Sequence, residues 1–136
     1  MAVPEMLRGE GKFTLLIKAQ ELATYTIKIV ANEKVFNPLY TRNIIDDIVF
    51  CAKEQFLLLS EANDINVQDE SDWRKRRRCQ LDALRYLKRL LRLIDIAHRV
   101  FHLPTSRVKY WGGLVIEMRI RVEKWNKKDT DRYSSY

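Results

Sequence analysis

A dense group of basic side chains lies between residues 74 and 99, where Asp82 and Asp95 are the only acidic residues. Several of these basic residues recur at intervals of seven, which places them along one side of a helix. Guanidinium groups stay charged and bind phosphate oxygens in pairs, so such a row predicts contact with a polyanion. The ten candidate nucleic-acid-binding or polymerase-binding residues are Arg74, Lys75, Arg76, Arg77, Arg78, Arg85, Lys88, Arg89, Arg92 and Arg99.

The charge is divided unevenly between the two halves of the chain. Residues 1–72 hold 7 basic and 12 acidic side chains, a balance of −5, whereas residues 73–136 hold 18 and 6, a balance of +12. This asymmetry indicates a polyanionic partner, or a protein partner with the opposite charge pattern. The sequence has no zinc-finger or RNA-recognition motif that would read bases. We therefore expect binding that depends on the nucleic-acid backbone and shape.

A second charged row suggests a different use for the arginines. Asp47, Glu54 and Glu61 also recur every seven residues, opposite the expected core stripe of their helix. On this pattern they face outward and would meet the arginines only between subunits, in a head-to-tail contact that closes into a ring. The three are therefore candidate subunit-interface residues. Simple solvation of the arginine row is a third interpretation, although local pairing with Asp82 and Asp95 leaves at least six basic groups without a local partner.

No residue pattern indicates catalysis. His98 and His102 lie four residues apart, but no carboxylate at helical spacing completes a metal site. Cys51 and Cys79 lack nearby histidines and are expected to be partly buried as small apolar side chains. Glycine-rich phosphate loops and nucleophile elbows are also absent. The sequence therefore predicts a protein that is not an enzyme, with no cofactor, no metal and no small-molecule substrate.

Four helices are expected to position these side chains. The chain has 4 Gly and 3 Pro in 136 residues, a low content that favours long helices. Apolar residues at steps of three and four predict helices over about residues 14–31, 39–63, 73–102 and 106–127. The fold class predicted is all-α, an up-and-down antiparallel four-helix bundle. We expect one domain over residues 1–136, with short flexible termini at about 1–12 and 127–136.

The third and fourth helices have the clearest core stripes. The inward residues of the third are expected to be Gln80, Leu84, Leu87, Leu91 and Ile94, and those of the fourth Val108, Trp111, Val115, Met118, Val122 and Trp125. Gly112 and Gly113 weaken the first turns of the fourth helix and are expected to leave room for a neighbouring helix.

The sequence predicts no contact with a membrane. No apolar run approaches the 18 residues of a membrane-spanning helix. The first ten residues also lack the apolar segment of a signal peptide. A cytoplasmic location is therefore expected.

Two helical segments carry a resemblance to a known family. They are residues 84–93, Leu-Arg-Tyr-Leu-Lys-Arg-Leu-Leu-Arg-Leu, and residues 117–125, Glu-Met-Arg-Ile-Arg-Val-Glu-Lys-Trp. The chain resembles, over most of residues 10–127, the four-helix-bundle family that includes the accessory variability determinant proteins of diversity-generating retroelements. Members are small basic bundles that assemble as pentamers and associate with a reverse transcriptase and its template RNA. The resemblance implies a homopentamer whose basic residues contact the polymerase, the RNA or DNA, or both.

The chain departs from the family pattern in three places. Its second helix begins Asn37-Pro38-Leu39-Tyr40. The connection over residues 63–72 is longer than usual, and the glycine pair lies at 112–113 instead of directly before Trp125. Relatives encoded within ribosomal RNA intervening sequences share the same bundle. The alternative function is therefore a protein-only homo-oligomeric scaffold without direct nucleic-acid contact.

Overall fold

A computed structural model describes the backbone of residues 2–136 and the side chains of residues 11–136. Its four long helices are α1 (Ala2–Val30), α2 (Asp46–Asp64), α3 (Glu70–Val100) and α4 (Thr105–Arg132). A short 3-10 helix, η1 (Pro38–Tyr40), and a π-helical turn, η2 (Thr41–Ile45), lie between α1 and α2. Residues 2–136 contain no strand, which confirms the all-helical fold class.

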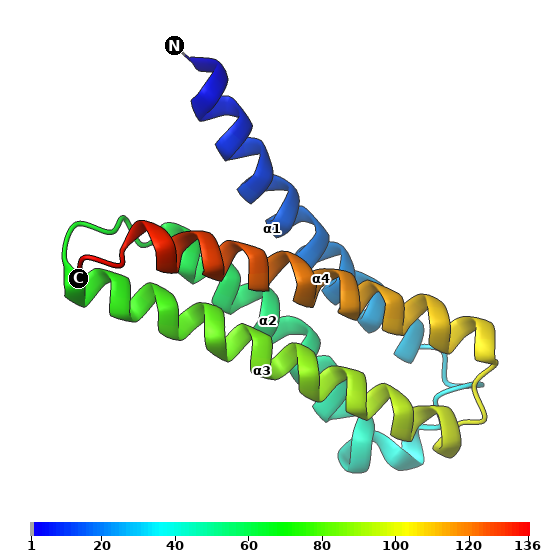
Figure 1. Ribbon diagram of the computed structural model, residues 1–136. Coiled ribbons are helices and arrows are strands. Elements are labelled where there is room, and N and C mark those ends of the chain that lie inside the picture. Colours follow the sequence, from blue (N-terminus) through cyan, green and yellow to red (C-terminus); the bar gives the residue numbers. More distant parts are fainter. Residues whose placement is uncertain (1) are drawn as a thin grey trace.

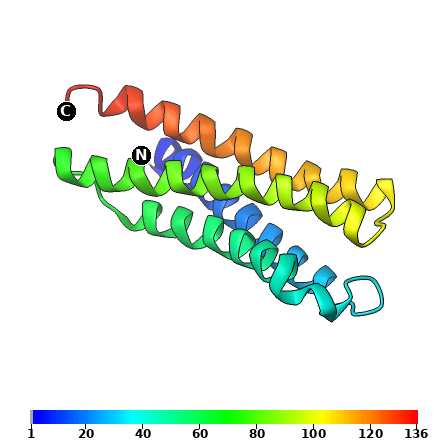
Figure 2. The same ribbon diagram turned by 90° about the horizontal axis from the view of Figure 1, so that it is seen from below.

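The helices pack as neighbours in the order of the chain. Helix α2 contacts both α1 and α3, and α4 contacts both α3 and α1, with the most extensive packing between α2 and α3. Helices α2, α3 and α4 lie side by side, whereas α1 crosses them obliquely and its first turns project beyond them (Figures 1 and 2). This arrangement is compatible with a helical bundle.

The helix ends differ from the predicted ones for local reasons. Helix α3 begins three residues earlier than expected because the Asp69 carboxylate accepts a hydrogen bond from the Asp72 backbone N–H at 2.8 Å. The segment expected to start the second helix instead forms η1 and η2, and the Asn37 side chain caps η1 by accepting from the Leu39 N–H. Residues 2–12 belong to α1 and residues 127–132 to α4, so helix extends into both segments expected to be flexible.

The core contains the stripes predicted from periodicity. In α3 the side chains of Gln80, Leu84, Leu87 and Ile94 are buried, and Leu91 is half-buried. In α4 the same pattern holds, with Val108 half-buried and Trp111, Val115, Met118, Val122 and Trp125 buried. The Trp111 indole also donates a hydrogen bond to the Thr26 hydroxyl at 3.0 Å, which ties α4 to α1.

Candidate nucleic-acid interface

Helix α3 exposes nine of the ten predicted basic side chains. Its apolar stripe packs into the bundle, and the remaining helical positions on the other side face solvent. The exposed residues are Arg74, Lys75, Arg77, Arg78, Arg85, Lys88, Arg89, Arg92 and Arg99. We call this set the arginine row. It lies on a straight helix about 46 Å long, at 1.5 Å per residue.

Few acidic groups neutralise the arginine row. Arg74 pairs with Glu70 at 2.8 Å and Arg85 with Asp82 at 3.6 Å, both within α3. Exposed pairs of this kind contribute only a few tenths of a kcal/mol. The other seven members form no ion pair with any side chain of residues 11–136, and Asp95 is likewise unpaired there. The row therefore keeps a strong positive charge.

Arg76 does not belong to the exposed row, so its assignment to the interface is wrong. Only 3% of its surface is exposed. Its Nε donates to Asp129 Oδ2 at 2.8 Å, and its guanidinium lies over the Trp125 ring, 5.1 Å from the centroid. The core stripe of α3, extended one turn back from Gln80, reaches position 76, and that extension would have predicted its burial.

Asp129 is the centre of a buried polar cluster that the sequence did not reveal. Gln80 Nε2 donates to the same Asp129 oxygen at 2.8 Å, and Asn126 Nδ2 donates to Gln80 Oε1 at 2.8 Å. The hydrogen bonds of this cluster hold the C-terminal end of α4 against α3. This contact explains why α4 continues past its predicted end at Lys127.

The acidic row of α2 lies closer to the arginines than expected. Asp47 lines a groove together with Arg89 and Arg92 of the same subunit, and Glu61 lies beside Cys79 of α3. The expectation that the acidic row does not meet the arginines within one bundle is therefore wrong for Asp47. Residues next to the core stripe of one helix lie close to the equivalent residues of the helix packed against it. Because these residues recur every seven positions, they stay at the edge of the helix–helix contact along its length.

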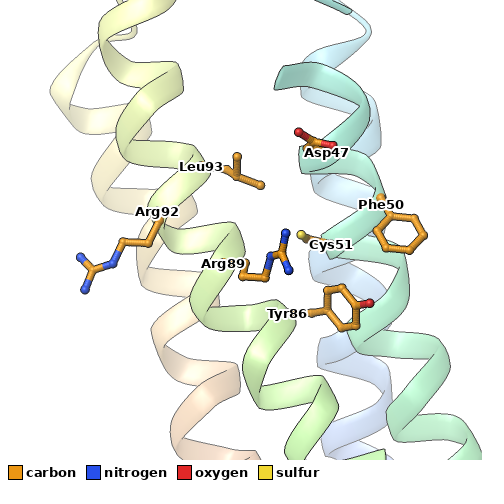
Figure 3. A pocket seen from close by; sticks show the side chains of 7 residues that line it. All are labelled: Asp47, Phe50, Cys51, Tyr86, Arg89, Arg92 and Leu93. Atoms are coloured by element: carbon orange, nitrogen blue, oxygen red, sulfur yellow. The ribbon is translucent and has the colours of Figure 1, made fainter. Parts of the chain in front are cut away.

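The groove between α2 and α3 has a volume of about 290 Å³. It is lined by Asp47, Phe50 and Cys51 from α2 and by Tyr86, Arg89, Arg92 and Leu93 from α3. Figure 3 shows the Arg89 guanidinium pointing toward Cys51, whereas Arg92 points away from the groove.

Two aromatic rings of the groove were missed by the sequence reasoning. Phe50 and Tyr86 contact each other edge to face, with ring centroids 5.7 Å apart, and the Arg85 guanidinium lies 5.1 Å from the Tyr86 centroid. Phe50 remains 49% exposed. Its position off the core stripe of its helix gave no signal by itself, because single exposed apolar side chains are common on protein surfaces.

The two cysteines are buried, more completely than predicted, and are poor nucleophiles. Burial raises the pKa of the Cys51 thiol. The charge of nearby Arg89 acts to lower this pKa, and that of Asp47 acts to raise it. Burial and the neighbouring Glu61 carboxylate raise the pKa of the Cys79 thiol to about 11. Both groups therefore stay protonated at neutral pH.

The two histidines lie at the end of α3. His98 is half-buried, and His102 is exposed with a φ of 53°, a left-handed conformation typical of the residue after a helix end. Within the described residues, no group of three or more His, Cys, Asp or Glu side chains is arranged to hold a metal ion. None of the described helices is both long and apolar enough to cross a membrane.

No protein-family model, curated protein or solved structure matches the chain. The resemblance seen in residues 84–93 and 117–125 therefore stays a prediction.

Proposed function

We propose that this protein is an oligomeric nucleic-acid-binding accessory protein that acts by binding and not by catalysis. The observation that carries the proposal is the arginine row, nine exposed basic side chains along one rigid helix. The resemblance in residues 84–93 and 117–125 supports the choice of a reverse transcriptase and its template RNA in a diversity-generating retroelement as partners. The proposal takes the four helices as an up-and-down antiparallel bundle, the assembly as a homopentamer and the location as cytoplasmic.

The length of the row suits a phosphate backbone. From Arg78 to Arg99 the helix rises about 32 Å. Several phosphates of one strand can therefore contact guanidinium groups at the same time, without any movement of α3. Such contacts give affinity that falls steeply with salt and depends little on base sequence.

A salt titration of RNA binding tests the proposal. If about five phosphates of a single strand are neutralised, the slope of log affinity against log salt concentration should be near −3.5. Fluorescence anisotropy of a labelled oligonucleotide measures the affinity. A flat salt dependence, or no binding at about 50 mM salt, would count against nucleic-acid binding.

A protein-only homo-oligomeric scaffold is the second candidate function. It is favoured by apolar side chains on α1 and α4 that remain exposed in a single copy. These two helices are joined by an ion pair in which Lys18 Nζ lies 3.4 Å from Glu117 Oε1. The exposed apolar side chains include Phe13, Ile17, Ile116 and Ile120. Contact with another copy would remove such groups from water.

The scaffold proposal predicts that a ring held by acid–base contacts dissociates when Asp47, Glu54 and Glu61 are all changed to Lys. Sedimentation velocity measures the assembly, and circular dichroism checks that the subunit stays helical. The matched control changes Glu21, Glu33 and Asp131, three exposed acidic residues elsewhere, to Lys. If the oligomer survives the first set of changes, the acidic row is not the interface.

A further inference from the structure

The groove between α2 and α3 places aromatic surface beside the arginine row. About half of Phe50 is exposed, and its ring contacts that of Tyr86. The Arg85 guanidinium lies over the Tyr86 ring. Exposed aromatic rings and guanidinium planes are the two protein surfaces on which unpaired bases stack. The groove therefore offers a base both kinds of surface.

The size of the groove limits its occupant. Its volume of about 290 Å³ lies just below the range of small-ligand pockets, which begins near 300 Å³. One planar ring system fits this space, whereas a helix of a partner protein requires a longer channel.

The charges around the groove are arranged for a ligand with an anionic backbone and a neutral, hydrogen-bonding ring. Arg89 lies within the groove, and Arg92 at its edge points outward, in continuation of the arginine row (Figure 3). Asp47 lies on the opposite wall, where its carboxylate repels phosphate but can accept hydrogen bonds from the N–H groups of a base.

We propose that this groove holds one unpaired base of a single-stranded nucleic acid while the adjoining phosphates contact Arg92 and its neighbours in the row. The inference rests on the proposed function and adds a preference for single strands. A base in a duplex is stacked and paired, so it reaches the groove only after its neighbours are unstacked. The protein should therefore bind single strands more tightly than duplexes.

Three probes matched in phosphate number test the preference. They are a single-stranded RNA, a duplex of half its length and a strand of equal length without bases, with affinities measured by anisotropy at one salt concentration. We expect the single strand to bind about 5- to 150-fold more tightly than the strand without bases, the usual contribution of one stacked base. Equal affinities for all three overturn the groove proposal and leave the proposed function intact. If none of the three binds, the proposed function itself fails.

The side chain that carries the inference is Phe50. Phe50→Ala should weaken binding of the single strand about 5- to 150-fold without changing the affinity of the strand without bases. Phe50→Trp keeps an aromatic face and should restore binding. The matched control is Leu57→Ala, because Leu57 is an equally exposed apolar residue of α2, at 52%, that does not line the groove.

Two results with these variants would overturn the proposal. One is an unchanged affinity of Phe50→Ala for the single strand. The other is an oligomer that dissociates on Phe50→Ala, measured by sedimentation velocity, while all RNA affinities stay intact. The second result would assign the groove to another copy of the chain.

Photocrosslinking locates the base directly. A single strand that carries 4-thiouridine should crosslink to the tryptic peptide of residues 43–53, which contains Phe50. Mass spectrometry identifies the modified peptide, and Phe50→Ala should reduce its yield. Crosslinks confined to residues 74–78 would show that the base lies outside the groove, contrary to the proposal.

Discussion

At the scale of single residues, the most consequential contact is the buried ion pair between Arg76 and Asp129. Both residues are almost fully removed from water, with 3% and 2% of their surfaces exposed. Removal of two charges from water is costly, and good geometry with further hydrogen bonds must offset that cost. Here Gln80 Nε2 donates to the carboxylate, and the Ile65 carbonyl accepts from the guanidinium at 3.3 Å.

Loss of one partner of this pair should destabilise the fold strongly. Asp129→Ala leaves a buried guanidinium without a counter-charge and should lower the free energy of unfolding by about 3–5 kcal/mol. Urea denaturation followed by circular dichroism measures the change. The control is Arg74→Ala, which breaks the exposed pair with Glu70 and should cost less than about 1 kcal/mol.

Replacement of both partners tests the cause of that loss. The double variant Arg76→Met, Asp129→Leu removes both charges and should be more stable than Asp129→Ala alone. If Asp129→Ala is no more harmful than Arg74→Ala, the pair is not shielded from water and the explanation fails.

At the scale of elements, the glycine pair of α4 turns out not to be required for close helix packing. A methyl group at position 112 would meet Leu91 Cδ1 at 3.5 Å, an ordinary contact, and one at position 113 would meet nothing within 4 Å. The expectation that these glycines leave necessary room for a neighbouring helix is therefore not supported within the subunit.

Replacement of the exposed glycine should stabilise α4. Gly113→Ala restores the helix propensity lost by glycine, which corresponds to about 1 kcal/mol. The expected rise in Tm is about 4 °C for a domain of this size. Scanning calorimetry measures it. A lower Tm would mean that another molecule packs closely over position 113.

At the scale of the whole molecule, the uneven charge distribution governs the expected interaction with a polyanion. Residues 73–136 carry a balance of +12, and the arginine row is its most ordered part. A localised row and a high net charge both attract nucleic acid, but only the row makes binding depend on particular positions.

The combined change of Arg85, Arg92 and Arg99 to Gln separates these two effects. It should make the salt slope shallower by about 0.7 for each lost phosphate contact, about 2 in all. The control changes Lys28, Lys34 and Lys53 to Gln, which removes the same charge from exposed positions outside the row. Equal losses of affinity in the two variants would show that net charge, and not the row, drives binding.

Much of this molecule follows from helical periodicity. The stripes of α3 and α4 predicted which side of each helix is buried, and the same geometry left nine basic residues exposed. The local spacing is sufficient to predict the buried side because a helix buries its apolar face whichever neighbouring helix packs against it. The existence of four helices could be predicted for the same reason.

The tertiary structure alone decided which charged and aromatic groups meet across helices. Asp129 lies 53 residues after Arg76, and Asp47 approaches Arg89 only because α2 and α3 are rotated with these edges together. Periodicity predicts which face of each helix is buried. It does not predict which residues at the sides of that face contact each neighbouring helix. The buried ion pair, the end of α4 and the groove beside Phe50 all depend on that rotation, which is determined by packing of the assembled core.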